Sequence, residues 1–324
     1  MRGSVLRVAY RGEPAPTLLD RPDTLAVFDF GVGADGTADP RHLRIPLPPL
    51  DAQPPRECWS VGDTVSHGRA GALHWAVGGG WRFVAVEVDE AGCGGIEAAS
   101  EHAYALLLGH VAESPECHLQ RIWNYLGAIN AGEGDGERYR LFCNGRARGL
   151  AARGITAYPA ATAIGHHGRP GLLQVYALCA REPGEALENP RQVSAWKYPR
   201  QYGPTAPSFA RAMQLPGGAL AISGTAAVIG HASHHADDVT AQADEAVANL
   251  HALLERAELP AFDALSPLKV YVRRPRDVER IRAALMRHLD PTVPRILLQG
   301  DICRRELLVE IDGWSNLPLR PTGG

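Results

Sequence analysis

Glu310 is the residue whose type and setting most clearly suggest chemistry. It lies in the run LLVEI, residues 307–311, where apolar residues occupy both faces of an expected strand. A carboxyl group in such a strand is partly removed from water, and because burial disfavours the charged form, its pKa rises. A general acid that works near neutral pH needs a raised pKa of this kind. An edge strand that turns Glu310 toward water is the alternative.

Five cationic residues lie in or beside segments rich in glycine and proline. They are Arg146, Arg148, Lys197, Arg200 and Arg211, with Tyr158, Tyr198 and Tyr202 nearby in sequence. Guanidinium groups bind carboxylates through paired hydrogen bonds, so such a set could hold a small dianion. Scattered surface arginines are the simpler explanation.

A third group combines imidazoles and carboxylates in the run GHASHHADD, residues 230–238. Its members are His231, His234, His235, Asp237 and Asp238, a density that can indicate a metal site. The run also directly precedes an expected helix, where Asp237 or Asp238 would serve as the N-cap. We favour the cap and expect no metal ion.

Other cofactor motifs are missing from the sequence. It contains no GxxxxGK[ST] phosphate loop, and the glycines at 78–80 precede an expected strand instead of opening a helix. The six cysteines are spread along the chain without a CxxC pair, which argues against a zinc knuckle or a redox motif. We therefore expect an activity that needs no cofactor.

The composition is that of a soluble globular protein. The chain has 324 residues, of which 45% are hydrophobic and 21% charged. This length suits about two domains. A formal net charge of -3 gives no basic excess for nucleic acid or an anionic membrane. No apolar run approaches the roughly 18 residues of a membrane span, and no secretion signal is evident. We expect a cytoplasmic monomer or small homo-oligomer.

The order of expected elements repeats along the chain. Strands are predicted at 81–88, 121–126, 161–165 and 172–178, with helices at 98–112 and 137–150. Strands are predicted again at 219–223, 268–273, 295–299 and 307–311, with helices at 238–258 and after Pro275. Matching strands start 134 to 147 residues apart, which indicates an internal duplication. The alternation that any α+β protein shows is the alternative.

The duplication predicts an α+β fold with two fused modules. We divide the chain into residues 1–180 and 181–324. Two segments with six prolines each, 40–55 and 181–216, are predicted as loops, because proline removes backbone donors. The second loop holds most of the cations and tyrosines named above, which favours a place in an active site. Residues 1–79 match no pattern and are treated as a proline-rich leader.

The second module resembles the reactive-intermediate deaminase fold, known as Rid or YjgF. The resemblance covers residues 215–313. It rests on Ser223 and Gly224, on Gln242, Ala246, Asn249 and Leu250 of the helix, and on the strands LKVYV (268–272) and LVEI (308–311). It implies modules in which a mixed sheet is backed by two helices, with sites in clefts between modules.

A longer part of the chain, residues 80–313, resembles the chorismatases. The matching motifs are RIWNY (121–125), NGR (144–146), YPAATAIG (158–165), ENPRQ (188–192) and the segment 198–210. The resemblance implies removal of the enolpyruvyl group of chorismate, which yields pyruvate and either a dihydroxycyclohexadiene carboxylate or a hydroxybenzoate. Cleavage of an enol ether needs one acid and no cofactor. A Rid-like imine hydrolase or ligand-binding protein is the alternative from a different class.

The resemblance also implies residue roles. Glu310 matches the family's acid. The cations that would meet the two carboxylates of chorismate are Arg146, Arg148, Arg200 and Arg211, with Tyr158, Lys197 and Tyr202 as weaker candidates. The branch of the family that forms hydroxybenzoate has a glycine after the serine of the first strand and a cysteine before the acid, here Gly224 and Cys303. We therefore expect 3-hydroxybenzoate, with 4-hydroxybenzoate as a possible second product.

Cys303 and Glu310 are seven residues apart, an odd number, so one regular strand would place them on opposite faces. For both side chains to face one pocket, the chain must turn or bulge within residues 304–306. The sequence therefore predicts a turn there.

Overall fold

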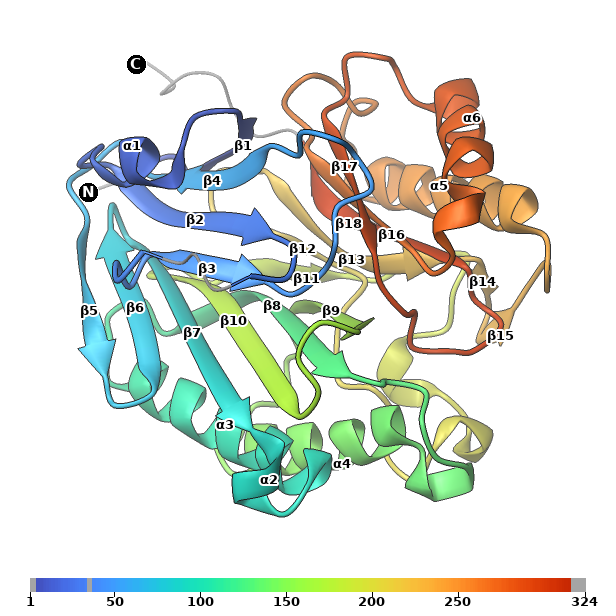
Figure 1. The fold of residues 1–324 in the computed structure, drawn as a ribbon, viewed down its shortest axis with the longest axis horizontal. Helices are drawn as coiled ribbons and strands as arrows, with labels where there is room; N and C mark the ends of the chain where they lie inside the picture. Colours follow the sequence, from blue (N-terminus) through green and yellow to red (C-terminus); the bar gives the residue numbers. More distant parts are fainter. Residues whose placement is uncertain (1–3, 34–36, 316–324) are drawn as a thin grey trace.

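Most strands of this protein belong to three sheets. In the residues that the computed structural model describes, 4–33 and 37–315, there are two six-stranded sheets, one four-stranded sheet and a two-stranded ribbon (Figure 1). The ribbon pairs β14 (Val228–Ile229) with β15 (Ala232–Ser233). No helix in the described ranges is long and apolar enough to cross a membrane.

The first six-stranded sheet has the strand order β5-β6-β7-β10-β8-β9. Its strands are β5 (Ser66–Ala70), β6 (Leu73–Gly78), β7 (Trp81–Asp89), β8 (His118–Gly127), β9 (Ala160–His166) and β10 (Leu172–Ala180). Neighbouring strands are antiparallel except β8 and β9, which are parallel. The helices of this module are α2 (Glu90–Cys93), α3 (Ile96–Ala112) and α4 (Arg138–Ala151).

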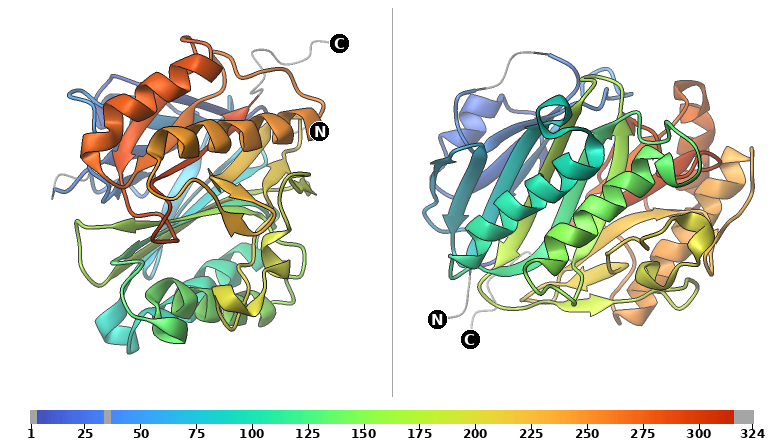
Figure 2. Two further views of the ribbon diagram at one scale, coloured as in Figure 1. Left: turned by 90° about the vertical axis from the view of Figure 1, so that its right-hand side faces the viewer. Right: turned by 90° about the horizontal axis from the view of Figure 1, so that it is seen from below.

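Two glycines on α4 allow α4 to pack closely on α3. A Cβ atom at Gly145 would lie 2.0 Å from the carbonyl oxygen of Glu97, and one at Gly149 would lie 2.5 Å from the Cβ of Tyr104. A larger residue at either position would force the helices apart. The close contact keeps both helices on one face of the sheet (Figure 2, right).

The second six-stranded sheet has the order β11-β12-β13-β18-β16-β17. Its strands are β11 (Glu185–Leu187), β12 (Ala212–Gln214), β13 (Leu220–Ala226), β16 (Leu268–Val272), β17 (Arg295–Gln299) and β18 (Val309–Ser315). Only β16 and β17 are parallel. The helices are α5 (Val239–Arg256) and α6 (Val278–His288).

The internal duplication is confirmed by the strand order. The strands β7, β10, β8 and β9 of the first sheet hold the same relative places as β13, β18, β16 and β17 of the second, and the one parallel pair falls at the same edge. Figure 2 shows the two helix pairs on opposite sides of the molecule, with the sheets between them. The expected α+β fold, two mixed sheets each backed by two helices, is therefore confirmed. We propose a boundary between the two modules at residues 180–181.

Residues 1–79 contain more structure than the expected leader. They supply β5 and β6 to the first sheet and form a further sheet of order β1-β4-β2-β3, with a short helix, α1 (Ala15–Leu19). Its strands are β1 (Arg7–Arg11), β2 (Thr24–Phe30), β3 (His42–Ile45) and β4 (Arg56–Ser60). The strand β3 lies inside the predicted loop 40–55. It is tolerated there because it is an edge strand, and prolines flank it without interrupting it.

The second predicted loop, 181–216, is mostly irregular but not entirely. It contains two short strands, β11 at the edge of the sheet and β12 next to it, which proline content concealed, and two 3₁₀ turns at Ala195–Lys197 and Arg200–Tyr202. This segment runs beside the first module, where Ala210 forms a bridge with Ala160 of β9.

The inner faces of all three large sheets meet in one aromatic core. Trp59 of β4 lies 5.4 Å from Trp123 of β8 and 5.8 Å from Trp314 of β18, measured between ring centroids. Phe83 and Tyr176 of the first sheet complete the contact around Trp59. Large aromatic side chains dominate the burial energy of such a core, so the two modules are held in a fixed relation.

Candidate active site

A cavity of about 520 Å³ lies where the two modules meet. Its walls come from the segment 132–140 of the first module, from 192–211, from the end of β13 at 224–228, and from 303–310. Cavities of this volume suit a small organic ligand.

Glu310 reaches this cavity from β18. Val309 and Ile311 on either side of it pack into the core beneath α5, so the alternation of the strand turns Glu310 to the other face. The side chain is buried, and this burial, with the nearby Asp312 charge, raises its pKa to about 8, although Arg121, Arg211 and Arg273 oppose the shift. Within the described residues the carboxyl group has no hydrogen-bond partner. It is therefore a protonated acid at neutral pH, available to a substrate.

Gly224 leaves the space that the Glu310 carboxyl group occupies. A Cβ atom at this position would lie 2.0 Å from Oε1 and 2.8 Å from Cδ of Glu310. Any larger residue would push the carboxyl group aside. The structure therefore places Glu310 directly against the glycine that the resemblance linked to hydroxybenzoate formation.

The predicted turn between Cys303 and Glu310 is confirmed. The Leu307 amide donates a hydrogen bond to the Arg304 carbonyl oxygen at 3.1 Å, and this turn brings the Cys303 side chain to the same cavity as Glu310. Burial and the neighbouring Glu310 raise the pKa of the Cys303 thiol to about 12. The group is a neutral thiol at physiological pH, not a thiolate nucleophile.

Arg211 and Tyr202 are the two predicted binding residues that line the cavity. Arg211 is buried, and its Nη2 donates to the Val193 carbonyl at 2.8 Å and to the Tyr198 hydroxyl at 2.6 Å. The Nε of Arg211 is buried without a partner in the described residues. An unmatched N–H on a cation at a cavity wall suits an incoming carboxylate.

Arg304 is a cavity residue that the sequence analysis missed. Its Nη1 donates to the His231 carbonyl oxygen at 2.9 Å and to Ser233 Oγ at 3.0 Å. Its guanidinium carbon lies 4.0 Å from the centroid of the Tyr202 ring, a cation–π contact that fixes its position. The signal was present in the sequence, because a turn that brings Cys303 to the cavity also brings the next residue there.

Arg211 and Arg304 differ from the other arginines at the cavity. In the described part of the chain, no carboxylate oxygen lies within 4.0 Å of either guanidinium group. By contrast, Arg140 pairs with Glu137 at 3.1 Å, and Arg305 Nε lies 3.9 Å from the other oxygen of Glu137. The positive charge available to a ligand therefore comes from Arg211 and Arg304.

The remaining predicted binding residues lie outside the cavity lining. Arg148 is exposed on α4 and pairs with Glu97 and Glu101 of α3, both at 2.6 Å. Arg200 is exposed and pairs with Asp135 at 2.6 Å. These surface ion pairs neutralise both charges. Arg148 and Arg200 are therefore scattered surface arginines, the simpler explanation given in the sequence analysis.

Three others support the walls from behind or lie at the surface. Arg146 is buried and donates to the Ser208 carbonyl oxygen at 2.8 Å, so it helps to hold the segment 192–211. Tyr158 packs its ring against Trp196 of the same segment at 5.8 Å. Lys197 is exposed.

The histidine run 230–238 is a helix cap, as expected. The Asp238 carboxylate accepts hydrogen bonds from the amides of Thr240 and Ala241 at the start of α5. His235 is bonded to Glu245, and His231 Nδ1 lies 3.2 Å from the Tyr202 hydroxyl. No group of three or more potential metal ligands occurs in the described ranges.

Comparison with known proteins identifies the class of enzyme. The family model for the N-terminal part of FkbO/Hyg5-like chorismatases matches residues 57–179. A crystal structure of a chorismatase superposes with a TM-score of 0.86 at 32% identity, over 98% of this chain and 100% of that chain. The chain belongs to the chorismatase family.

Among the similar relatives are two proteins from Streptomyces hygroscopicus. A 3-hydroxybenzoate synthase is 36% identical to this chain over 84% of both chains. A chorismatase is 36% identical over 79% of this chain and 78% of its own. Since only one of these two names states a product and the identities are equal, the product is argued below from residues of the site.

Proposed function

We propose that this protein converts chorismate to pyruvate and 3-hydroxybenzoate. The proposal depends above all on one feature of the cavity, a protonated carboxylic acid beside two arginines that have no carboxylate partner among the described residues. Chorismate carries two carboxylates and an enol ether, so its charges and its reactive bond match the groups that the cavity offers.

Glu310 would start the reaction as the general acid. It would protonate the terminal methylene of the enolpyruvyl group, which makes the ether carbon a cation that resembles an oxocarbenium ion. A pKa of about 8 keeps the proton on Glu310 at neutral pH. The absence of a hydrogen-bond partner among the described residues leaves that proton free to reach the substrate.

Arg211 and Arg304 would bind the substrate carboxylates. They approach the cavity from two different segments, 192–211 and the turn at 303–306, so they can hold two separate anionic groups. Tyr202 would orient Arg304 through its ring. Arg148 and Arg200 have no place in this proposal, because surface carboxylates hold both.

The product follows from the fate of the cation. Pyruvate and hydroxybenzoate together contain all the atoms of chorismate, whereas the dihydroxycyclohexadiene carboxylate requires one added water. In the first case the ring's own hydroxyl takes part and water must not. Gly224 and Cys303, the residues of the hydroxybenzoate-forming branch, both contact the region of Glu310. They support 3-hydroxybenzoate as the main product, with 4-hydroxybenzoate as a second one.

Incubation of the purified protein with chorismate tests the proposal. We expect pyruvate, measured by coupling to lactate dehydrogenase, in equal amount to 3-hydroxybenzoate measured by chromatography. Pyruvate with only the dihydroxycyclohexadiene carboxylate would establish the hydrolytic branch instead. If no pyruvate is released, the imine hydrolase or ligand-binding alternatives take precedence.

A further inference from the structure

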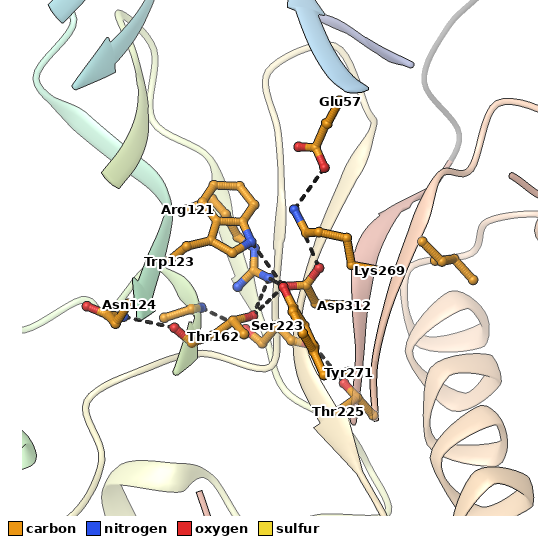
Figure 3. A network of polar contacts seen from close by, with 12 residues as sticks. Glu57, Arg121, Trp123, Asn124, Thr162, Ser223, Thr225, Lys269, Tyr271 and Asp312 are labelled. Atoms are coloured by element: carbon orange, nitrogen blue, oxygen red, sulfur yellow. Dashed lines mark hydrogen bonds and ion pairs between the residues drawn. The ribbon is translucent and has the colours of Figure 1, made fainter. Parts of the chain in front are cut away.

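A second carboxyl group lies on the same face of β18 as Glu310. Asp312 is two residues further along the strand, so the two side chains point the same way. Glu310 lines the cavity, whereas Asp312 is completely buried. Figure 3 shows the polar side chains that surround Asp312. The proposed reaction gives Asp312 no contact with the substrate.

One oxygen of Asp312 accepts four hydrogen bonds. The donors to Oδ2 are Thr162 Oγ1 at 2.7 Å, Tyr271 OH at 2.9 Å, Trp123 Nε1 at 3.0 Å and Arg121 Nη2 at 3.1 Å. Four donors that converge on one oxygen, the Arg121 guanidinium among them, form an arrangement that favours a carboxylate at this position. The four donors come from β8, β9 and β16.

Asp312 belongs to a buried cluster of four charged residues that has no net charge. Lys269 Nζ lies 3.8 Å from the other oxygen of Asp312 and 2.9 Å from Glu57 of β4. Arg121, Lys269, Glu57 and Asp312 are all almost fully buried, and their charges cancel. A buried ion cluster rarely adds stability over a well-packed apolar core, so its presence next to an acid calls for another explanation.

The cluster also reaches the wall that holds the acid. The Thr162 hydroxyl accepts a hydrogen bond from Arg121 at 2.7 Å while it donates to Asp312. The methyl group of Thr162 lies 3.4 Å from the position that a Cβ atom would take at Gly224. The same threonine therefore contacts the cluster on one side and the space around Glu310 on the other.

We propose that Asp312 is a positioning residue, whose fixed negative charge acts together with burial to keep Glu310 protonated and so supplies the acid for the reaction at neutral pH. This inference deepens the proposed function and depends on it for its consequence in catalysis. Arg121, Thr162, Trp123 and Tyr271 hold the Asp312 charge in place.

The arginines near Glu310 oppose the effect of Asp312 on its protonation. Arg121 of β8, Arg211 before β12 and Arg273 after β16 each favour the ionised form of Glu310. The turn after β17 presents the neutral Cys303 thiol, with Arg304 and the exposed Glu306 further along the wall. From β9 and β13 the uncharged residues Thr162, Gly224 and Ala226 lie near Glu310. Without Asp312, three arginines would act on Glu310 with no opposing charge on its own strand.

The variant Asp312→Asn tests the inference through the pH profile of kcat/KM for pyruvate release. Loss of the negative charge should move the alkaline limb of the profile to lower pH by about one unit or more, and the rate above that limb should fall about tenfold. At pH 5.5 the variant should stay close to the wild type. The control Tyr271→Phe removes one donor but no charge, and its limb should stay in place. An alkaline limb that does not move in folded Asp312→Asn would overturn the proposal.

A measurement on the unaltered protein covers the case in which the variant fails to fold. In ¹³C NMR of carboxyl-labelled protein without substrate, the Glu310 signal, identified by its absence in Glu310→Gln, should titrate near pH 8. Titration of Glu310 near its ordinary value of 4.5 would overturn the inference. Because this experiment needs no chorismate, its result holds even if the proposed reaction proves wrong.

Discussion

The strands β10 and β18 occupy the same place in the two repeated sheets, yet their inner faces differ in chemistry. On β10 the inner residues are Gln174, Tyr176, Leu178 and Ala180, and three of these join the aromatic core. On β18 they are Glu310, Asp312 and Trp314, and only the tryptophan joins that core. The first module supplies an apolar support, and the second supplies the acid.

This difference shows how each of the two repeated sheets accommodates polar side chains at buried positions. Gln174 on β10 is neutral, and its amide donates to the Arg44 carbonyl oxygen and to the Glu87 carboxylate. Two buried carboxyl groups on β18 cost far more to desolvate, and the cluster around Asp312 offsets that cost for only one of them. The other, Glu310, keeps its proton instead.

The strongest test of the comparison is Glu310→Gln. The variant keeps the size of the side chain and removes the acid, so pyruvate release should fall by the ~10²–10⁴-fold typical of general acid catalysis, with the fold retained. Steady-state kinetics and circular dichroism measure both properties.

The matched control lies on the first module. Glu87→Gln changes a carboxyl on β7, which is more than a third exposed at its side chain and remote from the cavity lining. It should leave pyruvate release within about twofold. Near-wild-type activity in Glu310→Gln would show that another group is the acid.

The next largest effect we expect is on KM for chorismate, and it should separate the arginines of the cavity from those of the outer surface. Arg211→Ala and Arg304→Ala each remove a charged hydrogen-bonding partner worth about 1.5–3 kcal/mol, so KM for chorismate should rise roughly 10- to 150-fold. Arg148→Ala breaks only exposed ion pairs and should leave KM unchanged. A rise in KM with Arg148→Ala, or none with the other two, would reverse this assignment.

The sequence predicted the repeated modules well because periodic apolar residues report directly on buried faces. The helices at 239–256 and 278–288 and the strands of both repeats lie close to their predicted ranges. The strands β5 and β11 were missed because they are exposed or very short edge strands, with little apolar pattern to detect. The same reasoning explains β3, which is short and bounded by prolines.

The site was less predictable than the fold. Glu310 was identifiable because its own strand buries it, which is local information. The distinction between Arg211 and Arg148 depends on which carboxylates fold against them, and Glu97 and Glu101 belong to a different helix from Arg148. Asp312 was overlooked for the same reason, since its partners come from strands up to 191 residues away.

Gly224 and Cys303 should affect the choice of product. In Gly224→Ala the new Cβ must displace the Glu310 carboxyl, whose Oε1 lies 2.0 Å from the Cβ position. Combined with Cys303→Ala, this change should shift the product from hydroxybenzoate toward the dihydroxycyclohexadiene carboxylate, and the displaced acid should lower pyruvate release by about 10²-fold. Chromatography of the products measures the ratio. Cys303→Ala alone serves as the control that leaves the acid in place, and an unchanged ratio in the double variant would refute the steering role.

The smallest effect we expect is on the free energy of unfolding, because Glu310 holds its proton more tightly in the folded chain than in the unfolded chain. The unfolded chain releases the Glu310 proton near the ordinary glutamate pKa of 4.5, whereas in the folded protein the pKa is about 8. Between these values the folded state binds more protons, so wild-type stability is fully present below the lower value and declines as the pH rises through the upper one. The loss is on the order of a few kcal/mol. Glu310→Gln cannot titrate, so its melting temperature relative to wild type should rise by roughly 5 °C between pH 5 and pH 9. Glu87→Gln should show no such rise in differential scanning calorimetry. A constant difference between Glu310→Gln and wild type across this range would mean that Glu310 is already ionised in the folded protein, and the acid of β18 would have to be sought elsewhere.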